Sequence, residues 1–161
     1  MSSGFDTFRK TGKLPSDERL KQLGLLIVDD EGEIVRSLKE TFSASFEIFE
    51  ATSGDAALEI VRTRSPKIVI SDQRMPKMTG VELFSKIKEI SPNTIRIILT
   101  GYSDIDVVAT ALNQGLAWKY ITKPWDAEML RALVIEGARL WLRNEGKSPG
   151  DVGLTSAFLG M

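Results

Sequence analysis

The sequence contains no cysteine and no histidine among its 161 residues. Without cysteine there is no disulfide, thiolate nucleophile or zinc–thiolate site, which is typical of a protein from a reducing compartment. Without histidine there is no Ser-His-Asp or Cys-His catalysis, no imidazole general base and no histidine-ligated metal. Any chemistry therefore depends on carboxylates, hydroxyls and lysine.

The sequence also lacks an excess of charge of either sign and any long apolar run. Twenty-one basic and 22 acidic residues give a net charge of −1, so there is no global attraction to nucleic acid or anionic membranes. The longest apolar runs have four or five residues, whereas a membrane span needs about 20. The first residues lack the apolar stretch of a signal peptide. We expect a cytoplasmic protein that binds neither membranes nor nucleic acid directly.

Short apolar runs alternate along the chain with segments of helical spacing. This alternation predicts an α/β fold with a doubly wound, five-stranded parallel sheet whose strands are buried on both faces. We expect the domain to span residues 24–143, between an N-terminal extension at 1–23 and a flexible C-terminal tail at 144–161. The predicted strands are 25–28, 46–49, 68–70, 95–99 and 118–121, and the last two helices are 104–114 and 126–143.

Polar side chains follow the predicted strands directly. Asp29 and Asp30 follow the first strand, Asp72 the third, Thr100 the fourth and Lys123 the fifth. In open α/β sheets, ligands bind at the carboxyl ends of the strands, where the strand order reverses. If the strand order is 2-1-3-4-5, the first and third strands are neighbours, and the three aspartates must lie close together.

Three neighbouring carboxylates repel one another unless a cation lies among them. Oxygen ligands suit Mg²⁺, which is held by one or two carboxylates together with water and phosphate oxygens. Lys123 and Thr100 can bind phosphate oxygens, and Gly101 leaves space for an incoming phosphoryl group. A carboxylate can form an acyl phosphate. Asp72 is the best candidate nucleophile, because the other two aspartates serve better as metal ligands.

Four stretches of the sequence resemble the response regulator receiver domain of two-component signalling. They are LLIVDDE at 25–31, SDQRMPKMTG at 71–80, LTG at 99–101 and YITKP at 120–124, in the order and at the intervals of that family. The resemblance covers about residues 24–143. It implies a flavodoxin-like receiver fold with strand order 2-1-3-4-5.

The resemblance also implies roles for the residues that match the family's motifs. Asp72 would accept a phosphoryl group from a phosphohistidine on a partner protein, with Mg²⁺ as cofactor. Asp29 and Asp30 resemble the acidic pair at the metal, with Asp30 the more direct ligand and the Arg74 carbonyl as a further ligand. The protein would be a phosphoacceptor and not an enzyme in the usual sense, with at most self-phosphorylation and autodephosphorylation.

Three further residues resemble the phosphoryl-binding and switch residues of the family. Thr100 and Lys123 match the hydroxyl and ammonium that hold the phosphoryl oxygens. Tyr120 matches the aromatic switch residue, which turns inward as Thr100 moves toward the phosphate. The Lys123–Pro124 peptide is expected to be cis. Arg74 and Tyr102 lie where family members differ, and their bulk favours slow autodephosphorylation.

The implied partners are a sensor histidine kinase or histidine phosphotransfer protein and a downstream protein effector. The surface of helix 104–114, strand 118–121 and helix 126–143 would signal, and a homodimer through that face is a second use of it. The chain ends about 18 residues after the last predicted helix. The alternatives are thus a protein that works alone and a receiver excised from a regulator with a transcriptional or cyclic-dinucleotide phosphodiesterase effector.

Two other functions are compatible with the same topology. A Mg²⁺-dependent aspartyl phosphatase would place its nucleophile after the first strand in a D-x-D pattern, which Asp29-Asp30-Glu31 does not supply. A flavin or nucleotide carrier would need a Gly-rich loop after the first strand. Both patterns are missing, so both functions are disfavoured.

Overall fold

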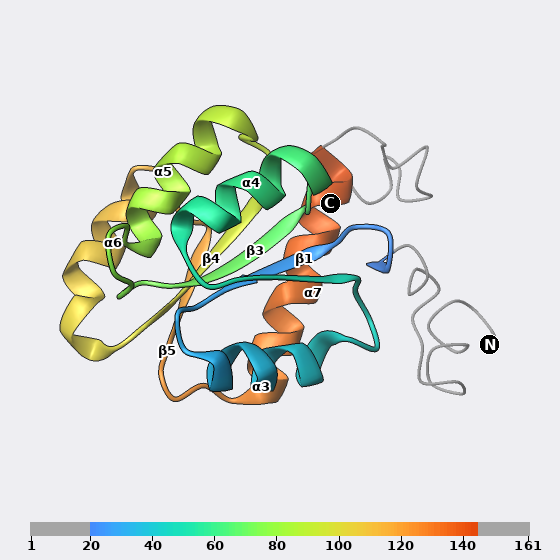
Figure 1. Ribbon diagram of the computed structural model, residues 1–161, viewed down its shortest axis with the longest axis horizontal. Coiled ribbons are helices and arrows are strands. Elements are labelled where there is room, and N and C mark those ends of the chain that lie inside the picture. Colours follow the sequence, from blue (N-terminus) through green and yellow to red (C-terminus); the bar gives the residue numbers. More distant parts are fainter. Residues whose placement is uncertain (1–19, 145–161) are drawn as a thin grey trace.

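The computed structural model describes residues 20–144 and contains a five-stranded, all-parallel sheet with the order β2-β1-β3-β4-β5 (Figure 1). The predicted doubly wound fold and its strand order are confirmed. Most of the predicted extension 1–23 and tail 144–161 lies outside the described residues. The elements are β1 Leu25–Val28, α3 Gly32–Phe42, β2 Ile48–Ala51, α4 Gly54–Arg64, β3 Ile68–Asp72, α5 Gly80–Ile90, β4 Ile95–Thr100, the 3₁₀ turn η1 Tyr102–Asp104, α6 Ile105–Asn113, β5 Lys119–Thr122 and α7 Ala127–Asn144.

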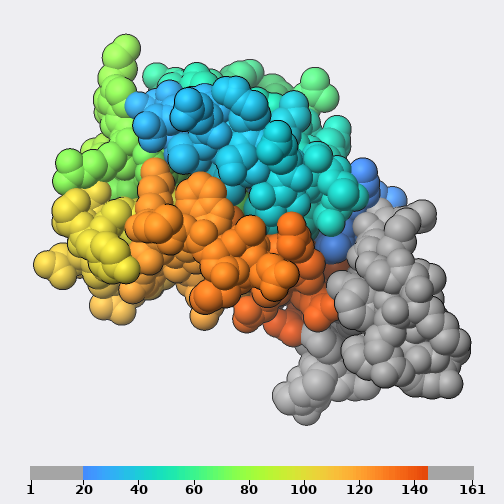
Figure 2. Space-filling model, turned by 90° about the horizontal axis from the view of Figure 1, so that it is seen from below, coloured from blue at the N-terminus to red at the C-terminus, as the bar shows by residue number. Residues whose placement is uncertain are grey.

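The helices cover the sheet in two layers. Helices α3 and α7 pack on one face, where they lie side by side (Figure 2), and α4, α5 and α6 pack on the other face (Figure 1). Each face has its own apolar cluster of buried side chains. Leu20 and Leu23 are buried in the cluster beneath α3 and α7, although both fall within the predicted extension. The packed part of the chain therefore includes residues 20–23.

The central strands match the expectation of burial on both faces, whereas the edge strands do not. All residues of β1, β3 and β4 are buried. In β5, Lys119 and Tyr120 are exposed, because an edge strand has a neighbour on one side only. Strand β2 begins at Ile48, two residues later than predicted. The reason is Phe46, which packs edge-to-face on Phe42 at the end of α3 instead of pairing in the sheet.

The loop between β3 and α5 is fixed tightly at both of its ends. Thr79 and Glu82 form a reciprocal capping box that starts α5. Gly80 follows at a point where a Cβ atom would collide with the carbonyl oxygen of Asp72. Only glycine fits there, so the first turn of α5 lies directly against the last residue of β3.

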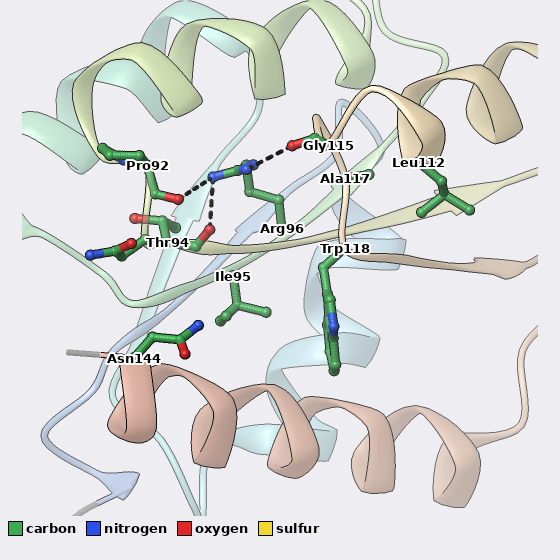
Figure 3. A pocket seen from close by; sticks show the side chains of 10 residues that line it. Pro92, Thr94, Ile95, Arg96, Leu112, Gly115, Ala117, Trp118 and Asn144 are labelled. Atoms are coloured by element: carbon green, nitrogen blue, oxygen red, sulfur yellow. Dashed lines mark hydrogen bonds between the residues drawn. The ribbon is translucent and has the colours of Figure 1, made fainter. Parts of the chain in front are cut away.

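A buried arginine closes the amino-terminal end of β4, away from the carboxyl ends of the strands. Arg96 is 7% exposed and lies beside a hollow of about 340 Å³ (Figure 3). Its guanidinium donates to the carbonyls of Leu116 at 2.8 Å, Thr94 at 2.9 Å, and Pro92 and Gly115 at 3.1 Å. Burial lowers the pKa of Arg96. These carbonyls follow the carboxyl ends of α5 and α6, where helix dipoles favour a positive charge.

We expect Arg96→Met to lower the free energy of unfolding by about 2–4 kcal/mol, because methionine keeps the apolar stem but removes every donor. Urea denaturation followed by circular dichroism measures the change. Arg62→Met is the matched control: Arg62 makes an exposed ion pair with Glu59 at 3.8 Å and no other ion pair within residues 20–144, so its loss costs less than about 0.5 kcal/mol. Equal stability of the two variants would contradict this role of Arg96.

Candidate functional site

The carboxyl ends of β1 and β3 bring three aspartates together. In the parallel register Val28 lies opposite Ser71, so the next residues, Asp29 and Asp72, are neighbours. One carboxylate oxygen from each of Asp29, Asp30 and Asp72 lies within 4.8 Å of the others. Asp29 and Asp72 are buried and Asp30 is exposed. The predicted cluster is therefore present, with one carboxylate open to solvent.

Asp29 has the most unfavourable electrostatic environment of the cluster. One of its carboxylate oxygens, Oδ1, accepts a hydrogen bond from the Glu31 backbone N–H at 2.9 Å. The other, Oδ2, is buried and has no hydrogen-bond partner among residues 20–144. Burial, opposed by the Glu31 N–H and reinforced by the negative charge of Asp72, raises the pKa of Asp29 from 3.8 to about 6.

Lys123 supplies the positive charge that the cluster needs. Its Nζ lies 2.8 Å from Oδ1 of Asp72 and 3.7 Å from Oδ2 of Asp29. Burial by itself would lower the pKa of Lys123. The hydrogen bond and charge of Asp72, with the further attraction of Asp29, outweigh burial and raise that pKa above its ordinary value. Lys123 is thus a cation held directly against Asp72, and its peptide bond to Pro124 is cis, as predicted.

Thr100 is the last residue of β4, and its side chain is buried beside the cluster. Its hydroxyl donates to the Gly101 carbonyl at 3.0 Å. The hydroxyl is therefore engaged within its own loop. A Cβ atom at Gly101 would meet no heavy atom of the described chain within 4 Å, so the space predicted at this glycine is open.

Tyr120 lies on the edge strand and points outward in this structure. It is 36% exposed and borders a hollow of about 520 Å³ whose lining also includes Trp125 and Met129. The hollow lies between β5 and the start of α7. An aromatic side chain in this place has room to change its position.

Arg74 follows Asp72 by two residues, and its side chain reaches across to the loop after β4. Its Nε lies 2.8 Å from Oδ2 of Asp104, and its Nη2 lies 3.2 Å from Oδ1. The same Nη2 donates to the Ser103 hydroxyl at 3.4 Å. The hydrogen bond with Asp104 raises the pKa of Arg74. The guanidinium therefore forms a two-point ion pair that joins the β3–α5 loop to η1.

Sequence reasoning missed two residues of this region, Gln73 and Asp104. Gln73 is buried next to Asp72, and its Oε1 accepts the Val81 N–H at 2.9 Å while its carbonyl accepts the Gly80 N–H at 3.0 Å. It ties the start of α5 to the end of β3. The sequence shows that a glutamine directly follows the candidate nucleophile, but not that it is buried. Asp104 gave none, because its partner lies 30 residues away.

The donor set fits a small, hard divalent cation. All the side-chain oxygens of the cluster are carboxylate oxygens, and Oδ2 of Asp29, which has no hydrogen-bond partner within the described part of the chain, is an acceptor that a cation would satisfy. With one aspartate exposed, the site is open on one side, as a cation that keeps water or phosphate ligands requires. The geometry is thus that of an acidic cluster that fits a small divalent cation, with a lysine beside it.

The match to a protein-family model decides the family. The model described as the response regulator receiver domain matches residues 25–135. The chain belongs to this family. Receivers bind Mg²⁺ through acidic residues and interact with histidine kinases or phosphotransfer proteins and with effector domains, and this receiver has such an acidic cluster. None of its helices within residues 20–144 is both long and apolar enough to cross a membrane.

Known proteins similar to this receiver differ greatly in length. The hydrogenase transcriptional regulatory protein HoxA of Cupriavidus necator is 33% identical over 65% of this chain and 22% of its own length. The sporulation initiation phosphotransferase F of Bacillus subtilis is 34% identical over 68% of this chain and 89% of its own length. A solved structure of a response regulator receiver domain protein from Clostridium thermocellum is 32% identical to this chain and matches it with a TM-score of 0.67. The match covers 76% of this chain and 96% of the Clostridium chain. This receiver therefore spans about a quarter of HoxA but most of the sporulation protein.

Proposed function

We propose that the chain is a phosphoacceptor in which Asp72 receives a phosphoryl group from a phosphohistidine of a partner protein. The contact between Lys123 Nζ and Asp72 Oδ1 at 2.8 Å, beside two further aspartates, carries this proposal. A lone surface carboxylate has no such surroundings. Here a carboxylate oxygen lies at an open, acidic edge with a cation in contact.

The transfer exchanges one bond to phosphorus for another. A carboxylate oxygen of Asp72 attacks phosphorus, the bond between phosphorus and the donor imidazole nitrogen breaks, and the electron pair of that bond returns to the imidazole. Lys123 pairs with the phosphoryl oxygens, and the Thr100 hydroxyl turns from the Gly101 carbonyl to donate to one of them.

Asp29, Asp30, Asp72 and the Arg74 carbonyl would hold Mg²⁺ at this edge. Bound there, the ion would offset the negative charge of the phosphoryl group during transfer. Asp29 would contribute its buried Oδ2, which has no hydrogen-bond partner among the residues that the structure describes. Asp30 is exposed, which leaves it free to move onto the ion or onto water bound to it.

The signal would leave through α6, β5 and the start of α7. Movement of Thr100 empties space beside β5, and Tyr120 turns inward from its exposed position. This rearranges a surface that carries Val107, 49% exposed, and Met129, 68% exposed. A downstream effector protein is the proposed partner for that surface, and self-association through it is the second use.

The position of the receiver in a larger assembly is also a proposal. HoxA is named as a transcriptional regulatory protein, and this receiver matches only a part of it. The sporulation initiation phosphotransferase F matches over most of its length, which favours a role in phosphoryl relay. Two arrangements are therefore proposed for the output. The receiver acts either on a transcriptional or phosphodiesterase effector domain of the same polypeptide, or on a separate protein.

The test is phosphorylation by a small donor. Incubation with acetyl phosphate and Mg²⁺ should add one phosphoryl group per chain, and borohydride reduction followed by peptide mass spectrometry should place it on Asp72. Chelation of Mg²⁺ should prevent the addition. A chain that gains no mass, or gains it with the same rate under chelation, contradicts the proposal.

A further inference from the structure

The ion pair between Arg74 and Asp104 connects the two loops that carry the reacting groups. Arg74 lies two residues after Asp72, and Asp104 lies four residues after Thr100. Nε of Arg74 donates to Oδ2 of Asp104 at 2.8 Å, and Nη2 donates to Oδ1 at 3.2 Å. Such a two-point contact fixes orientation as well as distance. The segment from Gly101 to Asp104 is thereby fastened to the loop that follows the acceptor.

Asp104 precedes α6, but its carboxylate contacts Arg74 and not the helix. Asp104 is the N-cap residue of α6, a position where an aspartate side chain ordinarily accepts a helix N–H. Here it makes no such capping bond. Its side chain is only 15% exposed, whereas that of Arg74 is 72% exposed. The carboxylate is thus bonded to Arg74 and does not cap the helix.

Two neighbouring groups, Thr100 and Tyr120, have their own surroundings in the same structure. The Thr100 hydroxyl is bonded to the Gly101 carbonyl, and Tyr120 is turned outward. Thr100 and Asp104 are joined by only three residues, so a movement of Thr100 toward Asp72 pulls on η1. The ion pair opposes that movement because it holds the far end of the same segment.

We propose that Arg74 and Asp104 are a positioning pair that fastens the loop after β4 in its resting place and so opposes the closed, anion-bound state of the site. The effect on anion binding rests on the proposed function, whereas the contact between Arg74 and Asp104 does not. Breaking the pair lets the loop close more easily, and the freed Asp104 can then cap α6.

The size of the effect follows from the exposure of the pair. Water and salt screen exposed ion pairs, so breaking this one should change an equilibrium constant by at most about fivefold. We expect Arg74→Lys and Asp104→Asn each to tighten binding of beryllium trifluoride with Mg²⁺ by about two- to fivefold, as measured by isothermal titration calorimetry. Lysine at position 74 keeps the positive charge near the anion but cannot make the two-point contact of the guanidinium. Asparagine at position 104 removes the ion pair and is itself a good N-cap.

The double variant separates this role from independent effects. If one contact is responsible, Arg74→Lys with Asp104→Asn binds no tighter than either single variant. Glu50→Gln is the matched control, because it removes a carboxylate from the exposed Lys39–Glu50 pair, which is also 2.8 Å long, and should leave binding unchanged. Tightening by Asp104→Asn together with weakening by Arg74→Lys would mean that Arg74 serves the anion directly, and would overturn the proposal. Additive effects or unchanged affinity would overturn it as well.

A second measurement needs no ligand and separates this proposal from the proposed function. Amide hydrogen exchange at residues 101–105 should be faster in both single variants than in the parent chain, with α3 unchanged. If the parent chain binds no beryllium trifluoride, the proposed function fails. The positioning role of Arg74 and Asp104 is then tested by hydrogen exchange alone. Exchange equal to that of the parent chain would overturn the positioning role.

Discussion

Asp72→Asn should abolish phosphoryl uptake from acetyl phosphate while leaving the fold intact. Asparagine has nearly the same shape as aspartate, and its amide oxygen can still accept the hydrogen bond of Lys123 now made at 2.8 Å. The amide lacks the anionic oxygen that forms the acyl phosphate. Mass spectrometry after incubation with acetyl phosphate and Mg²⁺ should therefore show no added phosphoryl group.

The control for this loss is a carboxylate outside the cluster. Asp55 lies in the first turn of α4, is exposed and has no part in the cluster, so Asp55→Asn should be phosphorylated like the parent chain. Circular dichroism shows whether each variant is folded. Labelling of Asp72→Asn at the parent rate would mean that another residue is the acceptor.

The site could be predicted from the sequence because parallel sheets align the ends of their strands. Asp29, Asp72, Thr100 and Lys123 each lie at or just after the end of an apolar run, and the ends of β1, β3, β4 and β5 share one edge. A residue's place directly after a predicted strand therefore predicted its place at this edge of the sheet. The same logic located the helices, because each crossover must return over the sheet.

The features that the sequence did not reveal depend on how loops pack. Phe46 belongs to an apolar run but packs on Phe42, because a tertiary contact overrides strand propensity at a sheet edge. Arg96 lies within an apolar strand. Its charge contacts carbonyls that follow α5 and α6, and these contacts depend on how the two helix ends pack around it. The pairing of Arg74 with Asp104 needs the relative placement of two loops. No local pattern encodes that placement.

The second large effect concerns Asp29, where a functional carboxylate destabilises the fold. We expect Asp29→Asn to raise the stability of the metal-free protein at neutral pH by about 1–2 kcal/mol and to weaken Mg²⁺ binding by about tenfold or more. Burial raises the pKa of Asp29 from 3.8 to about 6, so its charge is unfavourable in the folded state. Asparagine removes that charge and can still accept the Glu31 N–H, although Lys123 loses its ion pair with Asp29 and keeps the one with Asp72.

The sign of the pH dependence distinguishes this explanation from better packing. Between the unfolded pKa of 3.8 and the folded pKa of about 6, the folded protein binds more protons at Asp29 than the unfolded chain does. Stability of the metal-free parent protein should therefore fall as pH rises through this window, and that part of the fall should be missing in Asp29→Asn. Saturating Mg²⁺ should stabilise the parent protein at neutral pH much more than the variant, because only the parent keeps the buried oxygen as a ligand. Urea denaturation across this pH range, with and without Mg²⁺, measures both effects. Parallel stability curves for the two proteins would contradict the role of the Asp29 charge, since a packing effect has no reason to vary with pH.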